Sequence, residues 1–128
     1  MYCNILILLI VNLPAEGSLR IHDWYDISNP SGADFAKGAV EIFHSGVWGS
    51  ICGSNNDDSI AVIACKQLGY SAGYRKSYCC DYTSSSTKIW VNKMTCNGNE
   101  TSLMNCSFAY GTDTYSCSSR YKVECVSK

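Results

Sequence analysis

The chain has 128 residues and carries 10 Lys plus Arg against 11 Asp plus Glu, a net charge of −1. This length suits one small domain, and the balanced charge argues against nonspecific nucleic-acid binding. Nine cysteines in so short a chain are typical of an exported domain held together by disulfides. Zinc binding is the alternative, but no CxxC pair occurs and His22 and His44 lie far from cysteine pairs in the sequence.

The start of the chain predicts a secretory signal peptide over residues 1–17. Residues 5–11 form an almost unbroken apolar run, and Ala15 and Gly17 are small residues at the two positions that a signal peptidase reads. The run is shorter than the roughly 20 apolar residues that span a bilayer, and no later segment is apolar enough to cross one. Because no Lys or Arg precedes the run, a buried N-terminal strand is the alternative.

Cleavage after Gly17 leaves residues 18–128, which are predicted to form a single domain. Cys3 leaves with the signal peptide, so eight of the nine cysteines remain, an even number in a small secreted domain. The spacing of these cysteines does not by itself choose among their many possible pairings.

A β-hairpin is predicted in the first part of this domain. Residues 19–21 predict a first strand, and residues 29–32 (NPSG) predict a loop. Short apolar-rich runs then flank the turn signal at residues 44–46 (HSG), which indicates a hairpin that Cys52 closes.

A helix is predicted directly after the hairpin. Apolar residues recur every three or four positions over residues 60–68. Asn56 or Asp57 stands where an N-cap belongs, and Gly69 stands where a C′ glycine belongs. The sequence therefore predicts a hairpin followed at once by one amphipathic helix.

The rest of the chain alternates between irregular and short regular segments. Residues 71–87 are rich in Ser, Tyr, Gly and Cys, show no sustained period and are predicted to be irregular. The remaining predictions are a strand over residues 88–91, a helical turn over residues 99–106 with Leu103 and Met104 inward, and a closing strand over residues 123–126.

Several motifs, in order and at near-regular spacing, resemble the scavenger receptor cysteine-rich (SRCR) family. They are residues 46–52 (GVWGSIC), 64–69 (ACKQLG), 89–91 (IWV) and 96–103 (CNGNETSL), followed by Cys106. The resemblance covers residues 19–126. It implies an α+β fold in which a curved, antiparallel-rich β-sheet cradles one main α-helix.

The resemblance also implies a set of disulfides. The family's optional extra pair falls near Ala36 and at Tyr70, so the chain resembles the six-cysteine subgroup. Cys79 and Cys80 are left over, and they either bond each other or link one chain to another. The implied bonds are Cys52 with Cys117, Cys65 with Cys125, and Cys96 with Cys106.

Several family members bind a calcium-like cation through acidic side chains. The family's acidic pair falls on Gly53 and Ser54 here, which weakens this expectation. A reduced calcium site from Asp57, Asp58 and Glu100 remains as the expected metal site. The alternative for Asp57 is a helix N-cap.

A second candidate surface lies in the irregular segment, where tyrosines alternate with serines, as in adaptable binding loops. The alternative is that the tyrosine rings cover the underside of the helix or the sheet. The candidate ligand-binding residues are Tyr74, Arg75, Lys76, Tyr78 and Tyr82.

Catalysis finds little support in the sequence. Residues 69–73 (GYSAG) match the Gly-x-Ser-x-Gly nucleophile elbow, but that motif needs a strand before the serine and a helix after it. Here the helix comes first, so the chain is predicted not to be an enzyme. Sequons at Asn99 and Asn105 predict glycosylation, although the second sequon contains Cys106.

Together these features predict a secreted, extracellular, non-enzymatic recognition module. The resemblance implies that its ligand is a protein or a polyanionic or microbial surface, and the balanced charge argues against a nucleic acid. The alternative is a structural matrix or assembly protein that is cross-linked through Cys79 or Cys80. A further alternative is that the chain is one piece of a larger receptor.

Overall fold

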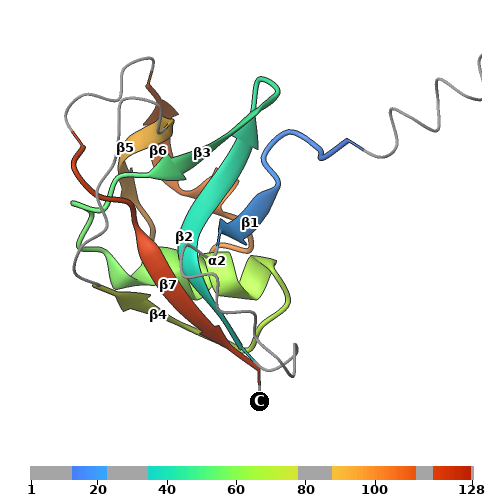
Figure 1. The fold of residues 1–128 in the computed structure, drawn as a ribbon. Helices are drawn as coiled ribbons and strands as arrows, with labels where there is room; N and C mark the ends of the chain where they lie inside the picture. The colour runs from blue at the N-terminus through green and yellow to red at the C-terminus, as the bar shows by residue number, and fades with distance from the viewer. Residues whose placement is uncertain (1–12, 23–34, 78–87, 112–116, 128) are drawn as a thin grey trace, which may run out of the picture.

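The structure is a computed structural model that describes residues 13–22, 35–77, 88–111 and 117–127. Strands predominate, with one α-helix and one 3-10 turn in the described part (Figure 1). In chain order the elements are β1 (Leu19–His22), β2 (Phe35–His44), β3 (Val47–Ile51), α2 (Asp58–Gln67), β4 (Ala72–Lys76), β5 (Ile89–Thr95), η1 (Leu103–Asn105), β6 (Ser107–Tyr110) and β7 (Lys122–Val126).

The strands form one curved sheet that wraps around α2 (Figure 1). Their order is β4-β7-β2-β3-β5-β6, and β1 pairs with β2 outside this path. Among the named strand pairs of the described residues, β3 and β5 run parallel and the others run antiparallel. The predicted α+β fold, a curved antiparallel-rich sheet cradling one helix, is confirmed.

The predicted hairpin is present as β2 and β3. Its turn places Ser45 at a φ of 51° and Gly46 at a φ of 80°, and both angles lie in the left-handed region that tight hairpin turns require. On β2, Val40 and Ile42 are fully buried because alternate side chains point to the same face of a strand. This face of the hairpin forms one wall of the core.

The predicted helix is also present, with both expected ends. Asp57 is the N-cap, and its side chain accepts a hydrogen bond from the Ser59 N–H at 3.0 Å. Gly69 lies past the C-terminus with a φ of 97°, and the Tyr70 N–H donates to the Cys65 carbonyl at 2.9 Å. Helix α2 buries Ile60, Ala61, Ile63, Ala64 and Cys65 against the sheet.

Two strands were not predicted. Residues 72–76 form β4 at one edge of the sheet, so the prediction that all of residues 71–87 are irregular is wrong. Pairing with β7 stabilises β4 despite its weak strand pattern. Gly73 lets this strand approach the helix, since a Cβ there would lie 2.6 Å from the Cys65 sulfur. The short β6 forms the opposite edge, next to β5.

The structure forms the three disulfides that the resemblance implies: Cys52–Cys117, Cys65–Cys125 and Cys96–Cys106. All six of these cysteines are buried. Cys79 and Cys80 lie outside the described residues. Within the described part, no helix has the length and apolar character needed to span a membrane.

Candidate functional site

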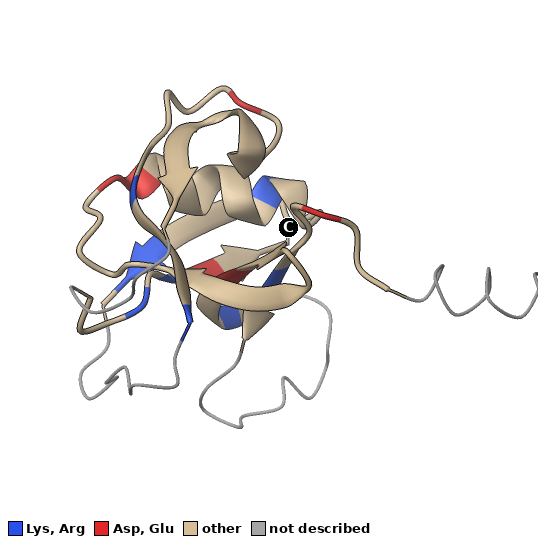
Figure 2. Ribbon diagram, turned by 90° about the horizontal axis from the view of Figure 1, so that it is seen from above, with Lys and Arg blue, Asp and Glu red and all other residues tan. Residues whose placement is uncertain are grey.

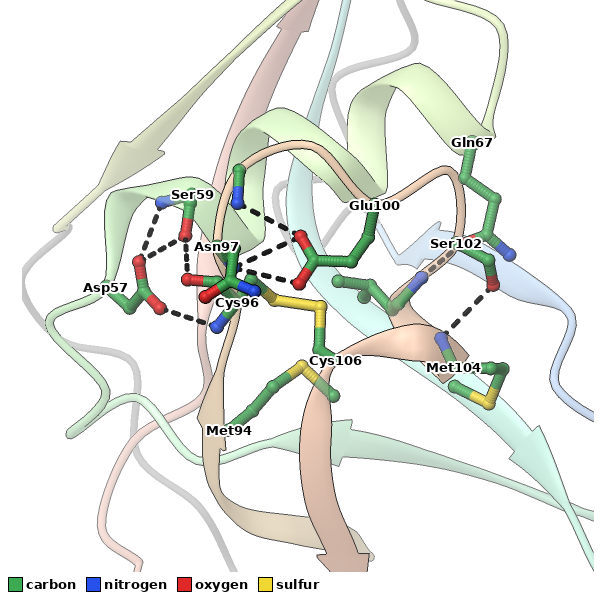
Figure 3. The surroundings of a disulfide bond; sticks show 12 residues. Asp57, Ser59, Gln67, Met94, Cys96, Asn97, Glu100, Ser102, Met104 and Cys106 are labelled. Carbon is green, nitrogen blue, oxygen red and sulfur yellow. Dashed lines mark hydrogen bonds between the residues drawn. A yellow bond between two sulfur atoms is a disulfide. The ribbon is translucent and has the colours of Figure 1, made fainter.

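The carboxylate of Asp57 joins the start of α2 to the end of β5 (Figure 3). One oxygen accepts hydrogen bonds from the Ser59 N–H and hydroxyl, and the other accepts from the Cys96 N–H at 2.9 Å. Burial alone would raise the pKa of this carboxyl, but the hydrogen bonds from Cys96 and Ser59 outweigh it and hold the pKa below its ordinary value. Asp57 therefore works as a cap and as a clamp between two elements.

The carboxylate of Glu100 closes the loop that follows Cys96 (Figure 3). It accepts hydrogen bonds from the Asn97 N–H at 2.9 Å and from the Gly98 N–H at 3.0 Å. These donors, the Asn97 N–H first, hold the pKa of Glu100 below its ordinary value. We call Asp57 and residues 96–100 together the acid loop.

Asp58 faces another element, since its carboxylate accepts a hydrogen bond from the Arg75 Nε on β4 at 2.9 Å. Each of the three predicted calcium ligands thus has N–H partners already. Calcium takes 6 to 8 oxygen ligands and would have to displace these donors. Glu100 also lies near the sulfurs of Cys96 and Cys106, but those sulfurs form a disulfide and are not thiolates. The calcium site stays a prediction.

A polar groove of about 610 Å³ lies beside Asp57, between the loop that enters α2 and strand β5. Asn55 is held rigidly in its lining, because its side chain donates to the Cys52 and Asn92 carbonyls and accepts from the Met94 N–H. The groove is lined by Ser54, Asn55, Asn56, Asp57, Asn92, Lys93, Met94 and Thr95.

Lys and Arg occur at several places on the fold, and some of them lie near one another on one side (Figure 2). The pairing of β4 with β7 sets Lys76 directly opposite Lys122, and like charges in that position repel each other. Lys76 also forms an ion pair with Glu124 at 3.2 Å, while the Lys122 ammonium donates to the Arg120 carbonyl at 3.4 Å. We call Arg75, Lys76, Arg120 and Lys122 the basic surface, of which Lys122 is buried and only 3% exposed.

The basic surface surrounds a small hollow of about 50 Å³. Gly53 forms part of its wall, because its N–H donates to the Ser119 carbonyl at 2.8 Å. A Cβ at this position would lie 2.8 Å from the Arg120 carbonyl oxygen, so only glycine allows this approach. The hollow is lined by Gly53, Arg75, Lys76, Ser77, Ser119, Arg120, Tyr121 and Lys122.

A comparison with known proteins identifies the family to which this fold belongs. The model of one family, the scavenger receptor cysteine-rich domain, matches residues 30–126. The chain belongs to this family.

Two relatives and one solved structure illustrate the similarity of this SRCR domain. "Macrophage receptor MARCO" of Mesocricetus auratus is 40% identical over 70 residues, which are 55% of this chain and 14% of the relative. "CD5 antigen-like" of Homo sapiens is 33% identical over 96 residues, 72% of this chain and 27% of the relative. The crystal structure of the dimeric form of the SRCR domain of mouse MARCO matches with a TM-score of 0.58 and 30% identity, over 73% of this chain and 89% of that one.

The SRCR family supports an extracellular recognition module, and its domains are typically non-enzymatic. This chain spans only 14% and 27% of the length of the two relatives named above. What those whole proteins do is therefore not transferred to this chain directly.

The predicted ligand-binding residues of this SRCR domain, together with Tyr70 of the same tyrosine-rich segment, divide into three groups. Arg75 and Lys76 lie on the basic surface, and Tyr74 on the same strand is 55% exposed. Tyr70 packs partly buried against the core, as the alternative reading of the tyrosines expected. Tyr78 and Tyr82 lie outside the described residues.

Other predicted residues are also placed. Ser71, the serine of the Gly-x-Ser-x-Gly match, precedes β4 and donates its hydroxyl to the Val126 carbonyl at 3.1 Å. A helix before it and a strand after it are the reverse of a nucleophile elbow. The sequon residues Asn99 and Asn105 are both exposed, and their glycosylation stays a prediction.

Sequence reasoning missed Arg120 and Lys122 as members of a site. They are more than forty residues away from Arg75 and Lys76 in the chain, and the pairing of β4 with β7 brings them together. The signal for the basic surface in the sequence is the short pair Arg75-Lys76, which by itself is too small to indicate a basic patch.

Proposed function

We propose that this chain is a secreted SRCR recognition module that binds polyanionic surfaces, microbial ones among them, through its basic surface. The module acts by binding and carries out no chemistry. Its ligands present repeated sulfate, phosphate or carboxylate groups, because a basic surface attracts such polymers over a distance of about one Debye length.

The observation that carries this proposal is the meeting of three exposed or partly exposed cationic side chains, Arg75, Lys76 and Arg120, around one hollow that the buried Lys122 also lines. Arg75 and Lys76 line it from β4, Lys122 from the first position of β7, and Arg120 from the segment just before β7. Guanidinium groups bind planar anions through two parallel hydrogen bonds, and lysine ammonium groups add point charges. The hydroxyls of Ser77 and Ser119 add hydrogen-bonding groups to the same wall.

Binding to immobilised dextran sulfate, with neutral dextran as the blank, tests the proposal. The full chain is secreted from cultured cells and recovered from the medium, which tests its export as well. We expect binding to dextran sulfate that weakens as salt rises from about 0.05 M to about 0.5 M, since salt screens exposed charges. Arg75→Gln with Lys76→Gln is expected to weaken binding about tenfold by removing two charge-assisted contacts.

The matched control is Lys66→Gln with Lys93→Gln, which removes the same charge from exposed positions on α2 and β5. This control is expected to bind almost as well as the parent chain. Unfolding temperatures of both double variants check that neither has lost its fold. Equal losses in the two variants, or no binding by the parent chain, would contradict the proposal.

A further inference from the structure

A tight turn just before β1 is docked on the end of β2. The Ser18 N–H donates to the Ala15 carbonyl at 3.0 Å and closes the turn. The Gly17 N–H then donates to the Phe43 carbonyl at 2.8 Å, and the Phe43 N–H donates to the Ser18 carbonyl at 2.9 Å. The blue segment that leads into β1 accordingly passes beside the end of β2 (Figure 1).

The carboxylate of Glu16 is held by two donors at the hairpin turn. His44 donates from its Nδ1, and the Ser45 N–H donates at 3.2 Å. Because a carboxylate only accepts, the proton of this bond belongs to the histidine Nδ1. The bond from His44 is the main reason why the pKa of Glu16 lies below its ordinary value.

Aromatic rings fix the orientation of His44. Its ring stacks on Tyr110, with 3.5 Å between the centroids and 5° between the planes, and it meets the Trp90 ring edge-on at 4.5 Å. The Tyr110 hydroxyl in turn donates to the Met104 sulfur at 3.3 Å. His44 is thus held by Trp90 of β5 and Tyr110 of β6, and Tyr110 is bonded in turn to Met104 of η1.

The residue after Glu16 has to be glycine. Gly17 is buried and has a φ of 83°, a region that other residues rarely adopt. A Cβ there would lie 3.1 Å from the Met104 Cγ and 3.2 Å from its sulfur. We call Phe43, His44, Ser45, Met104 and Tyr110 the cradle. It fits a carboxylate side chain followed by glycine.

Residues 13–17, whose Glu16 and Gly17 occupy the cradle, add little to the structure of the folded domain. Residues 13–17 contain no strand and no disulfide, and the Glu16 side chain is 58% exposed. The sequence also predicts that these residues leave with the signal peptide. Removing them would open the cradle while its walls on β2, β6 and η1 stay in place.

We propose that the cradle is a recognition site for a peptide turn in which an acidic residue precedes glycine. In the full chain its occupant is the chain's own Glu16-Gly17, and removal of the residues before Ser18 opens it to such a turn on a partner protein. The cradle uses none of the residues of the basic surface, so the test of this site is independent of the test of the polyanion site.

The test uses the full chain and the variant Gly17→Val, which expels the chain's own turn and leaves every cradle residue unchanged. The probe is the acetylated peptide Leu-Pro-Ala-Glu-Gly-Ser, followed by NMR through the Ser45 amide and the His44 ring. We expect a saturable shift in the variant. We expect no shift in the parent chain at up to about 1 mM peptide, because a tethered segment competes at a millimolar effective concentration.

Two altered peptides sharpen the test. Replacing Glu by Gln in the peptide should weaken binding about tenfold, since a hydrogen bond to a charged group is lost. Replacing Gly by Val should abolish binding. The variant Glu16→Gln repeats the experiment with the turn glycine intact, and it too should accept the peptide. Absence of peptide binding in both variants, or equal binding of the Glu and Gln peptides, would overturn the proposal.

Discussion

The acid loop and the basic surface differ in the partners of their charged side chains. In the acid loop, the carboxylates of Asp57 and Glu100 accept hydrogen bonds from backbone N–H groups. On the basic surface, Arg75 and Lys76 pair with the exposed or half-exposed carboxylates of other side chains. The carboxylates of the acid loop are therefore part of the folded framework. The cations of the basic surface instead surround a hollow at the surface.

This difference shows why residue type alone does not identify a site. Backbone N–H groups that lack a partner inside the fold need an acceptor, so a nearby carboxylate becomes structural. A surface ion pair contributes little to folding and exchanges readily with an outside ligand. We therefore expect the acid loop to affect stability and the basic surface to affect binding.

The largest expected effect on stability comes from Asp57→Ala. This change removes the N-cap and the bond to the Cys96 N–H together, and we expect a loss of about 2 kcal/mol in the free energy of unfolding. Urea unfolding measures it. Asp57→Asn is the control, because its side-chain oxygen still accepts a hydrogen bond at the N-cap, and it should lose clearly less. Equal stability of Asp57→Ala and the parent chain would show that the clamp contributes nothing.

Low pH is expected to reduce the stability that the acid loop contributes. The pKa values of Asp57 and Glu100 lie below the ordinary values of 3.8 and 4.5 when the chain is folded. Their stabilisation is therefore complete above the ordinary values, and it is lost as the pH falls through the lower folded values. Urea midpoints between about pH 7 and pH 3 should decline at the acid end.

The control for the pH experiment is the double variant Asp57→Asn with Glu100→Gln. These amides do not titrate, so the decline should be shallower in the double variant than in the parent chain. An unchanged pH profile in the double variant would assign the acid sensitivity to other carboxyls.

The smallest expected effect is that of calcium. At a concentration equal to its Kd, an ion stabilises the folded chain by about 0.4 kcal/mol, which raises the Tm by roughly 2–3 °C. Because Asp57 and Glu100 already accept backbone hydrogen bonds, we expect a rise no larger than this at about 1 mM calcium. The rise should vanish in Asp57→Ala with Glu100→Ala. A rise that persists in this variant would place a calcium site elsewhere, and a larger rise that vanishes in it would show that these carboxylates bind calcium despite their backbone hydrogen bonds.

The sequence predicted the parts of the fold that local patterns determine. The hairpin turn, the N-cap at Asp57 and the glycine after α2 depend on residues close together in the chain, and all three are present. Strand β4 was missed because three of its five residues, Ala72, Gly73 and Lys76, carry little strand propensity. Its partner β7 lies about fifty residues later and decides its conformation.

The candidate sites were harder to predict for the same reason. Glu100 was expected to bind a cation, but the distance of a carboxylate from backbone N–H groups cannot be read from spacing. Glu16 was expected to leave with the signal peptide, and its contact with His44 spans 28 positions. Arg120 joins Arg75 only once β7 has paired with β4.

The position of β7 has a consequence for how the chain is made. This last strand lies between β4 and β2 inside the sheet, and it supplies Cys125, while Cys117 lies just ahead of it. Their partners Cys52 and Cys65 are synthesised 65 and 60 residues earlier. A ribosome must therefore release the chain through residue 126 before the sheet can close, and until then these two early thiols are open to wrong partners. Cys96 and Cys106, only 10 residues apart, can pair first.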